Sequence, residues 1–210
     1  MKKLLFFFTA SILILSCKKD DTPATSGVGP APGDCSKLPY KKGSSLTMSL
    51  ANGVGITSTY SKDTTINGQY YVGAPGTSTN GISAVSWVGL NSNREVLLYV
   101  NSIGDLPASN IIAHKLNAAV GATWSQTFAS VSLPTDISYK YTYTVLSNSE
   151  TFSFNGVNYT GGQKVRGDFQ ITFFGSPMST TSTISTYCCG IGIVKTEESG
   201  NVRTLTAYKY

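Results

Sequence analysis

The side chains with the most varied chemistry in this 210-residue sequence are four cysteines, Cys17, Cys35, Cys188 and Cys189. A cysteine can be acylated, bridged, bound to a metal or left as a thiol, and its surroundings decide which. Cys17 directly follows an apolar run near the N-terminus. Cys188 and Cys189 are adjacent, which is not the paired spacing of a zinc site. One cysteine therefore ends an apolar leader, and three compete for a single disulfide bridge within the chain.

The first sixteen residues have the pattern of a secretory signal. Met1–Lys3 is short and positive, and Leu4–Leu15 is almost wholly apolar. That run is too short to cross a bilayer as a helix, which takes about 20 residues. Leu15-Ser16-Cys17 resembles the lipobox of bacterial lipoproteins. The resemblance implies that residues 1–16 are removed and that Cys17 becomes the acylated, palmitate-bearing first residue of an outer-membrane protein. The alternative is an ordinary secreted protein with a chance cysteine.

The residues after Cys17 predict a charged spacer followed by a tether. Lys18-Lys19-Asp20-Asp21 resembles the export signal of surface lipoproteins in the Bacteroidetes, which implies the extracellular face of the outer membrane. The alternative is a solvated spacer. Residues 17–34 are rich in Pro, Gly, Ser and Thr and lack a hydrophobic period, so we expect a flexible tether. Residues 35–210 then form a single domain, long enough to bury a core.

The disulfide can be predicted from strand parity. If residues 188–194 are extended, Cys189 shares the apolar face with Ile191 and Ile193, and Cys188 points outward. We therefore expect a Cys35–Cys188 bridge, with Cys189 as a free, buried thiol. A bulge at Gly190 would exchange the two roles, and a bridge between the adjacent cysteines would be strained.

The remaining reactive residues do not form a recognisable catalytic or metal site. His114 is the only histidine and has no acid or cysteine at ligand spacing, so we expect a surface or half-buried side chain. There is no Gly-x-Ser-x-Gly motif, and Glu197-Glu198 is expected in a solvated turn before Gly200. We expect no catalytic residue, metal or cofactor. The formal charge of +5 falls to +3 without Lys2 and Lys3, which is too small to indicate nucleic acid.

The aromatic residues are the best lead to a ligand. Tyr139, Tyr141 and Tyr143 alternate with polar residues, so they share one face of a strand. An exposed row of rings could stack on sugars or contact an apolar ligand, whereas the alternative is cross-strand packing in the core.

Strand and turn signals fill the domain and place it in the all-β class. Lys164–Phe173, Tyr139–Val145, Leu46–Leu50 and Val202–Tyr210 read as strands with period two. Asn-Gly at residues 67–68 and 155–156 predicts type I′ hairpins, and Ser92-Asn93 and Gly200-Asn201 predict two more. The likeness of the two Asn-Gly hairpins has two explanations: duplication of a half-domain, or turn chemistry that such hairpins share. Ser109–Ala119 is the one place where a short turn of helix is expected.

Three segments of the second half carry a further resemblance. They are Val120–Trp124 with its Gly-x-x-Trp, Thr151–Val165 with its Asn-Gly hairpin, and Tyr187–Lys195 with its Gly-Ile-Gly-Ile-Val-Lys. In this order they resemble uncharacterised Bacteroidetes lipoproteins that are distantly similar to the half-open β-barrel of lipoprotein carriers. The resemblance implies a curved antiparallel meander that forms a half-open barrel and can enclose an apolar cavity. The alternative architecture is a two-sheet β-sandwich. The paired cysteines at 188 and 189 depart from that family's pattern.

These observations favour a lipid-anchored, non-enzymatic outer-membrane protein that binds a hydrophobic or glycan ligand. The alternatives are a polysaccharide hydrolase, which needs two close carboxylates in a cleft, and a structural or adhesion module. A small outer-membrane barrel is disfavoured, because most of the expected strands are shorter than the 9–11 residues that span a membrane.

Overall fold

The computed structural model describes residues 31–77, 83–101, 107–130 and 136–210, and within them every regular element is a β-strand. The all-β prediction is confirmed. The strands form two antiparallel sheets that do not close into a barrel. Cys17 and residues 18–30 of the predicted tether lie outside the described residues, whereas residues 31–34 form a turn that is bonded to Cys189 through Gly33. No helix in the described part of the chain is long and apolar enough to cross a membrane.

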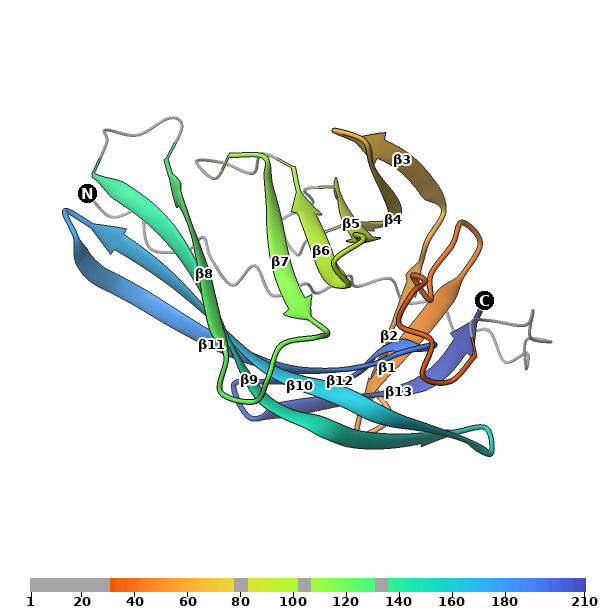
Figure 1. Ribbon diagram of the computed structural model, residues 1–210. Helices are drawn as coiled ribbons and strands as arrows, with labels where there is room; N and C mark the ends of the chain where they lie inside the picture. Colours follow the sequence, from red (N-terminus) through yellow and green to blue (C-terminus); the bar gives the residue numbers. More distant parts are fainter. Residues whose placement is uncertain (1–30, 78–82, 102–106, 131–135) are drawn as a thin grey trace.

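The larger sheet has eight strands. In spatial order they are β2 (Gly55–Thr59), β1 (Ser45–Leu50), β13 (Asn201–Lys209), β12 (Gly192–Glu198), β11 (Ser176–Cys188), β10 (Val157–Phe173), β9 (Ile137–Phe154) and β8 (Thr123–Ala129). Figure 1 shows this sheet curving into a trough, with the long strands β9 to β11 running across the whole molecule.

The smaller sheet is a five-stranded meander lying on the concave side of the trough (Figure 1). Its strands are β3 (Lys62–Ile66), β4 (Gln69–Thr77), β5 (Ser83–Leu90), β6 (Glu95–Val100) and β7 (Ser109–Lys115). Consecutive strands pair throughout both sheets, and the one non-consecutive pairing joins β1 to β13. The chain thus follows one meander, interrupted between β2 and β3 and between β7 and β8.

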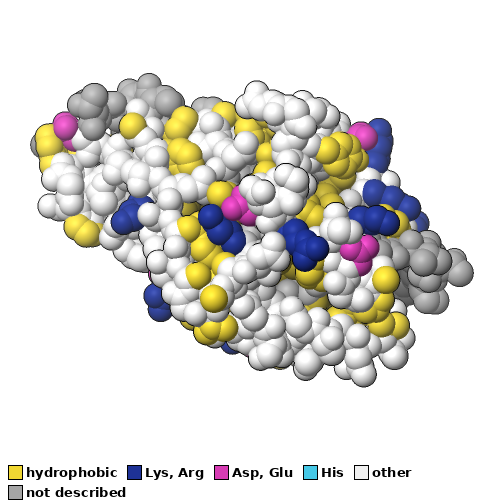
Figure 2. All heavy atoms as spheres, in the orientation of Figure 1, with side chains coloured by type: hydrophobic (Ala, Val, Ile, Leu, Met, Phe, Trp, Pro, Cys, Tyr) yellow, Lys and Arg dark blue, Asp and Glu magenta, His cyan; other side chains and the backbone are white. Residues whose placement is uncertain are grey.

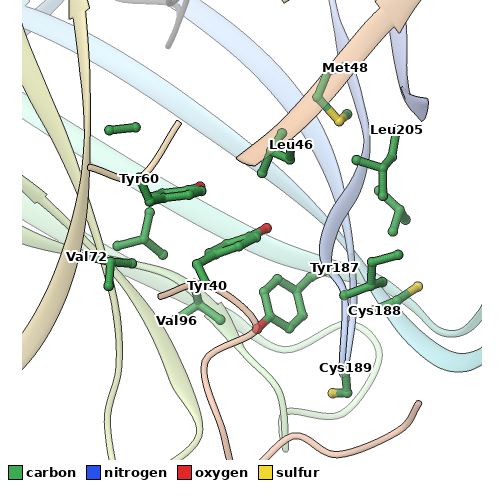
Figure 3. Close-up of a cluster of buried hydrophobic side chains, with 14 residues drawn as sticks. Tyr40, Leu46, Met48, Tyr60, Val72, Val96, Tyr187, Cys188, Cys189 and Leu205 are labelled. Carbon is green, nitrogen blue, oxygen red and sulfur yellow. The ribbon is translucent and has the colours of Figure 1, made fainter. Parts of the chain in front are cut away.

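The hydrophobic core fills the space between the two sheets. Apolar residues of β4 to β6 face those of β1, β11, β12 and β13, and Figure 3 shows Tyr40 lying among them. The Tyr40 ring stacks on Tyr60 with a centroid distance of 4.6 Å. Its hydroxyl accepts a hydrogen bond from the backbone nitrogen of Ile193 at 2.8 Å. Tyr40 therefore ties the start of the domain to the first residues of β12.

Most local predictions that rest on alternation and turn chemistry are confirmed, but the turn predicted at Gly200-Asn201 lies one residue earlier, at Ser199-Gly200, because Asn201 begins β13. The four predicted strands lie within β10, β9, β1 and β13, and Val165 and Val145 are buried on the expected face. Asn67 and Asn155 have φ of 50° and 49°, as a type I′ turn requires. The two hairpins lie in different sheets with different strand lengths, so turn chemistry accounts for their likeness.

Two local expectations are wrong. Residues 109–115 form strand β7 instead of a turn of helix, because Ser109, Ile111 and His114 point into the core while β7 pairs along β6. Glu197 and Glu198 end strand β12, and the turn that follows is at Ser199 and Gly200.

Candidate functional site

The disulfide joins Cys35 to Cys189, so the expected Cys35–Cys188 bridge is wrong. The parity argument fails because residues 188–191 form a turn: the backbone nitrogen of Ile191 donates to the carbonyl of Cys188 at 3.2 Å, and Gly190 has a φ of 89°. Cys189 lies in that turn and faces the start of the domain, where the nitrogen of Gly33 donates to its carbonyl.

Cys188, and not Cys189, is the free and buried thiol. It is the last residue of β11, it is fully buried, and Figure 3 shows its sulfur pointing away from Cys189. Burial raises the pKa of the Cys188 thiol to about 11, and the nearby Glu150 carboxylate adds to the shift. The thiol therefore stays protonated at neutral pH and is a poor nucleophile.

The predicted tyrosine row lies on the concave face of the large sheet, within a wider group of rings. We call this group the aromatic face. It comprises Trp124 and Phe128 of β8, Tyr139, Tyr141 and Tyr143 of β9, and Phe169 of β10. The strand register brings the group together, because β8 and β10 pair on either side of β9.

Ring contacts hold the aromatic face in one arrangement. Trp124 stacks on Tyr143 with a centroid distance of 5.6 Å and an interplanar angle of 17°. Tyr141 lies 4.7 Å from Phe169. Gly167 provides room for Tyr143, since a Cβ at that position would lie 2.8 Å from Cε1 of the ring. Such contacts fix ring orientations and contribute about 0.5–1.5 kcal/mol per pair beyond burial.

The three predicted tyrosines are not equivalent. Tyr139 is only 3% exposed and stacks parallel to Phe169, so it belongs to the packed interior. Tyr141 and Tyr143 are half-buried, and within the described residues neither hydroxyl has a hydrogen-bond partner. Burial raises the pKa of Tyr141 to about 12 and that of Tyr143 further. Both hydroxyls therefore remain neutral and able to donate or accept a hydrogen bond.

The edge of the aromatic face meets the smaller sheet through side chains. The indole nitrogen of Trp124 donates to the carbonyl of Ile112 at 2.7 Å. The Gln126 amide accepts from the nitrogen of Ile112 at 2.7 Å and donates to the carbonyl of Asn110 at 2.8 Å. Lys115 also places its ammonium 5.7 Å from the Trp124 ring centroid. These contacts satisfy backbone groups of β7 that no neighbouring strand pairs.

His114 lies at the centre of a buried polar network between the sheets. Contrary to the sequence-based expectation it is 1% exposed, because β7 turns it toward β10 and β11. Gln163 donates to the carbonyl of Lys115 at 2.7 Å, which leaves its oxygen facing Nδ1 of His114 at 3.3 Å. Nδ1 must then carry the proton, so Nε2 accepts from the hydroxyl of Ser185 at 2.9 Å. Burial lowers the pKa of His114 to about 4.

A shallow pocket of about 250 Å³ lies on the opposite, convex face of the large sheet. Its lining residues are Arg166, Ser182, Ile184, Glu197, Glu198, Ser199, Gly200 and Val202. Glu197 lies 3.0 Å from Lys195 and 3.5 Å from Lys164. A hydrogen bond from Lys195, together with the charges of both lysines, lowers the pKa of Glu197. It is an ionised carboxylate, unlike the protonated acid that glycoside hydrolysis requires.

Among the described residues, no three His, Cys, Asp or Glu side chains gather as a metal-binding cluster. The aromatic face is where half-buried rings and hydroxyls gather on one surface. The sequence alone could not place the rings of β8 and β10 beside the tyrosine row, because that requires knowing how β9 pairs with both strands. No protein-family model, curated protein or solved structure matches this chain.

Proposed function

We propose that this chain is a lipid-anchored, non-enzymatic binding protein of the outer membrane. In this proposal residues 1–16 are cleaved, Cys17 is acylated, and the domain is displayed on the extracellular face. The aromatic face binds a hydrophobic or glycan ligand. The proposal takes its location from the leader and the lipobox-like Leu15-Ser16-Cys17.

The observation that carries the binding proposal is the pair of half-buried rings at Tyr141 and Tyr143. Each presents part of its ring, and a hydroxyl without a partner among the described residues. Neither hydroxyl is among the buried side-chain atoms that lack a partner, so each is accessible from solvent. An accessible hydroxyl next to ring surface is suited to a ligand with apolar and polar parts.

Two observations support a non-enzymatic role. In the Ser185–His114–Gln163 network the serine hydroxyl donates to His114, as a nucleophile does to its general base. However, His114 is almost fully buried and its pKa is low. An amide in the third position also cannot stabilise an imidazolium as a carboxylate does. We expect a fluorophosphonate probe to leave both the wild-type chain and Ser185→Ala unlabelled. Labelling that depends on Ser185 would replace this proposal with a serine hydrolase.

Ligand binding can be followed with Trp124, because it stacks on Tyr143. In a Trp87→Phe background Trp124 is the only tryptophan, since the chain has two. We expect its emission to shift on titration with a fatty acid or with an oligosaccharide from the source cell surface. Tyr141→Ala and Tyr143→Ala should weaken the response at least tenfold, whereas Tyr70→Ala, an exposed tyrosine on β4, should not. If neither probe shifts the emission, the structural or adhesion alternative is favoured.

The anchor is tested separately. Labelling of cells with an alkyne-modified palmitate should tag the wild-type chain and not Cys17→Ala. Protease treatment of intact cells should then remove the domain. If the labelled protein survives on intact cells and is cut only after lysis, the extracellular assignment is wrong.

A further inference from the structure

Four hairpin turns of this protein have the same two-residue backbone conformation, and one of them carries an unexpected side chain. The pairs are Asn67-Gly68 (φ 50° and 79°), Asn155-Gly156 (49° and 76°), Ser199-Gly200 (48° and 80°) and Phe174-Gly175 (48° and 76°). A residue with a bulky side chain is rarely found at positive φ, whereas Asn is common there. Phe174 therefore occupies a position where the chain elsewhere uses Asn or Ser.

Packing does not explain the choice of Phe174. Its side chain is 68% exposed, and its ring meets Phe173 edge-on with a centroid distance of 4.4 Å. Phe173 is 44% exposed and Met178, on the other strand of the hairpin, is 57% exposed. The bond that fixes the turn to β9 runs from the backbone nitrogen of Phe174 to the carbonyl of Asp136, so it does not depend on the ring. Folding would be served equally well or better by Asn.

The turn itself and β11 are uncharged, but Asp136 is bonded to the turn through its backbone carbonyl. No charged residue occurs in the 26 positions between Asp168 and Lys195, which include the whole of β11. Asp136 directly precedes β9, and Lys140 of β9 lies opposite Gln170 of β10. We call residues 173–178 the hairpin tip. Figure 1 shows it at the upper left, where the long strands end. Figure 2 shows hydrophobic side chains beside an acidic one at that end, and most Lys and Arg side chains elsewhere on this face.

We propose that the hairpin tip inserts into a lipid surface. A projecting pair of phenylalanines with a methionine has no concave surface to receive a protein side chain, and a lipid interface deforms around such a shape. Ser and Thr on the adjoining strand are neutral. Asp136 adjoins the turn, so insertion must be shallow enough to leave its carboxylate in water. Transfer of the exposed apolar area out of water supplies the driving force.

The inference uses the proposed lipid anchor only to bring the chain to a membrane, and the geometry permits both contacts. The Cys35–Cys189 bridge and the tip lie at opposite ends of β11, whose 13 residues span about 43 Å. The 13 residues from Lys18 to Pro30, which precede the turn at residues 31–34, reach about 45 Å when extended. Cys17 and the tip can therefore meet one bilayer when the tether is stretched along the domain.

The test places a tryptophan at equivalent turns. Phe174→Trp, Asn155→Trp and Asn67→Trp are introduced into the acylated full chain, bound to vesicles of phosphatidylethanolamine and phosphatidylglycerol that carry brominated acyl chains. The fluorescence of the wild-type protein, which has two tryptophans of its own, is subtracted. We expect brominated lipid to quench the introduced tryptophan of the Phe174→Trp variant at least threefold more than that of either Asn→Trp variant. Equal quenching at the three turns would overturn the proposal.

Two further measurements keep this result interpretable. Vesicle flotation of the acylated chain is established first, so failure of the anchor is seen separately from failure of the tip. Phe174→Asn should leave the midpoint of urea unfolding unchanged or higher; a marked fall would mean that Phe174 serves folding and would overturn the proposal. Concentration-dependent self-association that Phe174→Asn abolishes, without lipid quenching, would assign the tip to a second copy of the chain instead.

Discussion

The side-chain amide of Gln126 pairs with the backbone of Ile112 as a neighbouring strand would, accepting from its nitrogen at 2.7 Å. The same amide donates to the carbonyl of Asn110, two residues earlier on β7. An unpaired strand edge exposes donors and acceptors that favour aggregation, and proteins normally cover it. Here Gln126, together with Trp124 of the same strand, covers the edge of β7 and joins the two sheets at the point where the meander is interrupted.

Replacing Gln126 should therefore destabilise the domain. We expect Gln126→Ala to lower the free energy of unfolding by about 2–3 kcal/mol, because two hydrogen bonds are lost and two backbone groups become unsatisfied. Urea denaturation measures the change. The control is Thr127→Ala, the next residue on β8, which is exposed and should change stability by less than about 0.5 kcal/mol. Equal effects of the two substitutions would show that Gln126 does not cover the edge.

The buried His114 predicts loss of stability in mild acid. The histidine pKa is about 6.5 when unfolded and about 4 in the folded protein, so between these values the unfolded chain binds the extra proton. Stability from this group is complete above pH 6.5 and falls by up to about 3 kcal/mol as the pH drops toward 4.

The single histidine makes this prediction directly measurable. The imidazole resonances should show no titration of the folded protein between pH 7 and 5, and His114→Asn should flatten the pH dependence of unfolding in the same window. An imidazole that titrates near 6.5 in the folded state would contradict the buried position.

The disulfide assignment predicts a specific thiol count. Under non-reducing, denaturing conditions the wild-type domain should expose one thiol, Cys188→Ala none, and Cys189→Ala two. Alkylation followed by mass spectrometry gives these numbers. Loss of the bridge should lower stability by about 2–5 kcal/mol, since it closes a long loop across 154 positions. A Cys189→Ala variant without free thiols would mean that Cys35 pairs with Cys188.

Gly192 is predicted to tolerate no side chain. Its φ is 92°, and an added Cβ would overlap the hydroxyl of Tyr40, which itself accepts a hydrogen bond from Ile193. Gly192→Ala should cost more than about 3 kcal/mol in the free energy of unfolding, from backbone strain and displacement of a buried ring. Gly200→Ala separates these effects, because its φ of 80° is similar and the space around it is open. The two substitutions should differ by about 2 kcal/mol or more.

The sequence by itself determined the strand class and the local geometry of this protein. Alternation in Lys164–Phe173 and positive φ at Asn67 and Asn155 depend on residues within a few positions of one another, so they could be predicted without the tertiary structure. The predicted leader and the predicted acylation of Cys17 also rest on a short contiguous pattern, and they stay predictions.

Only the tertiary structure decided which cysteine is bridged, where His114 lies and which rings join the tyrosine row. Cys188 and Cys189 exchange roles because a turn at Gly190 ends the strand on which the parity argument relied. His114 is buried because two sheets meet over β7, and Trp124 reaches Tyr143 because β8 pairs with β9 in one register. These contacts join residues far apart in the chain, and no local pattern specifies such pairings.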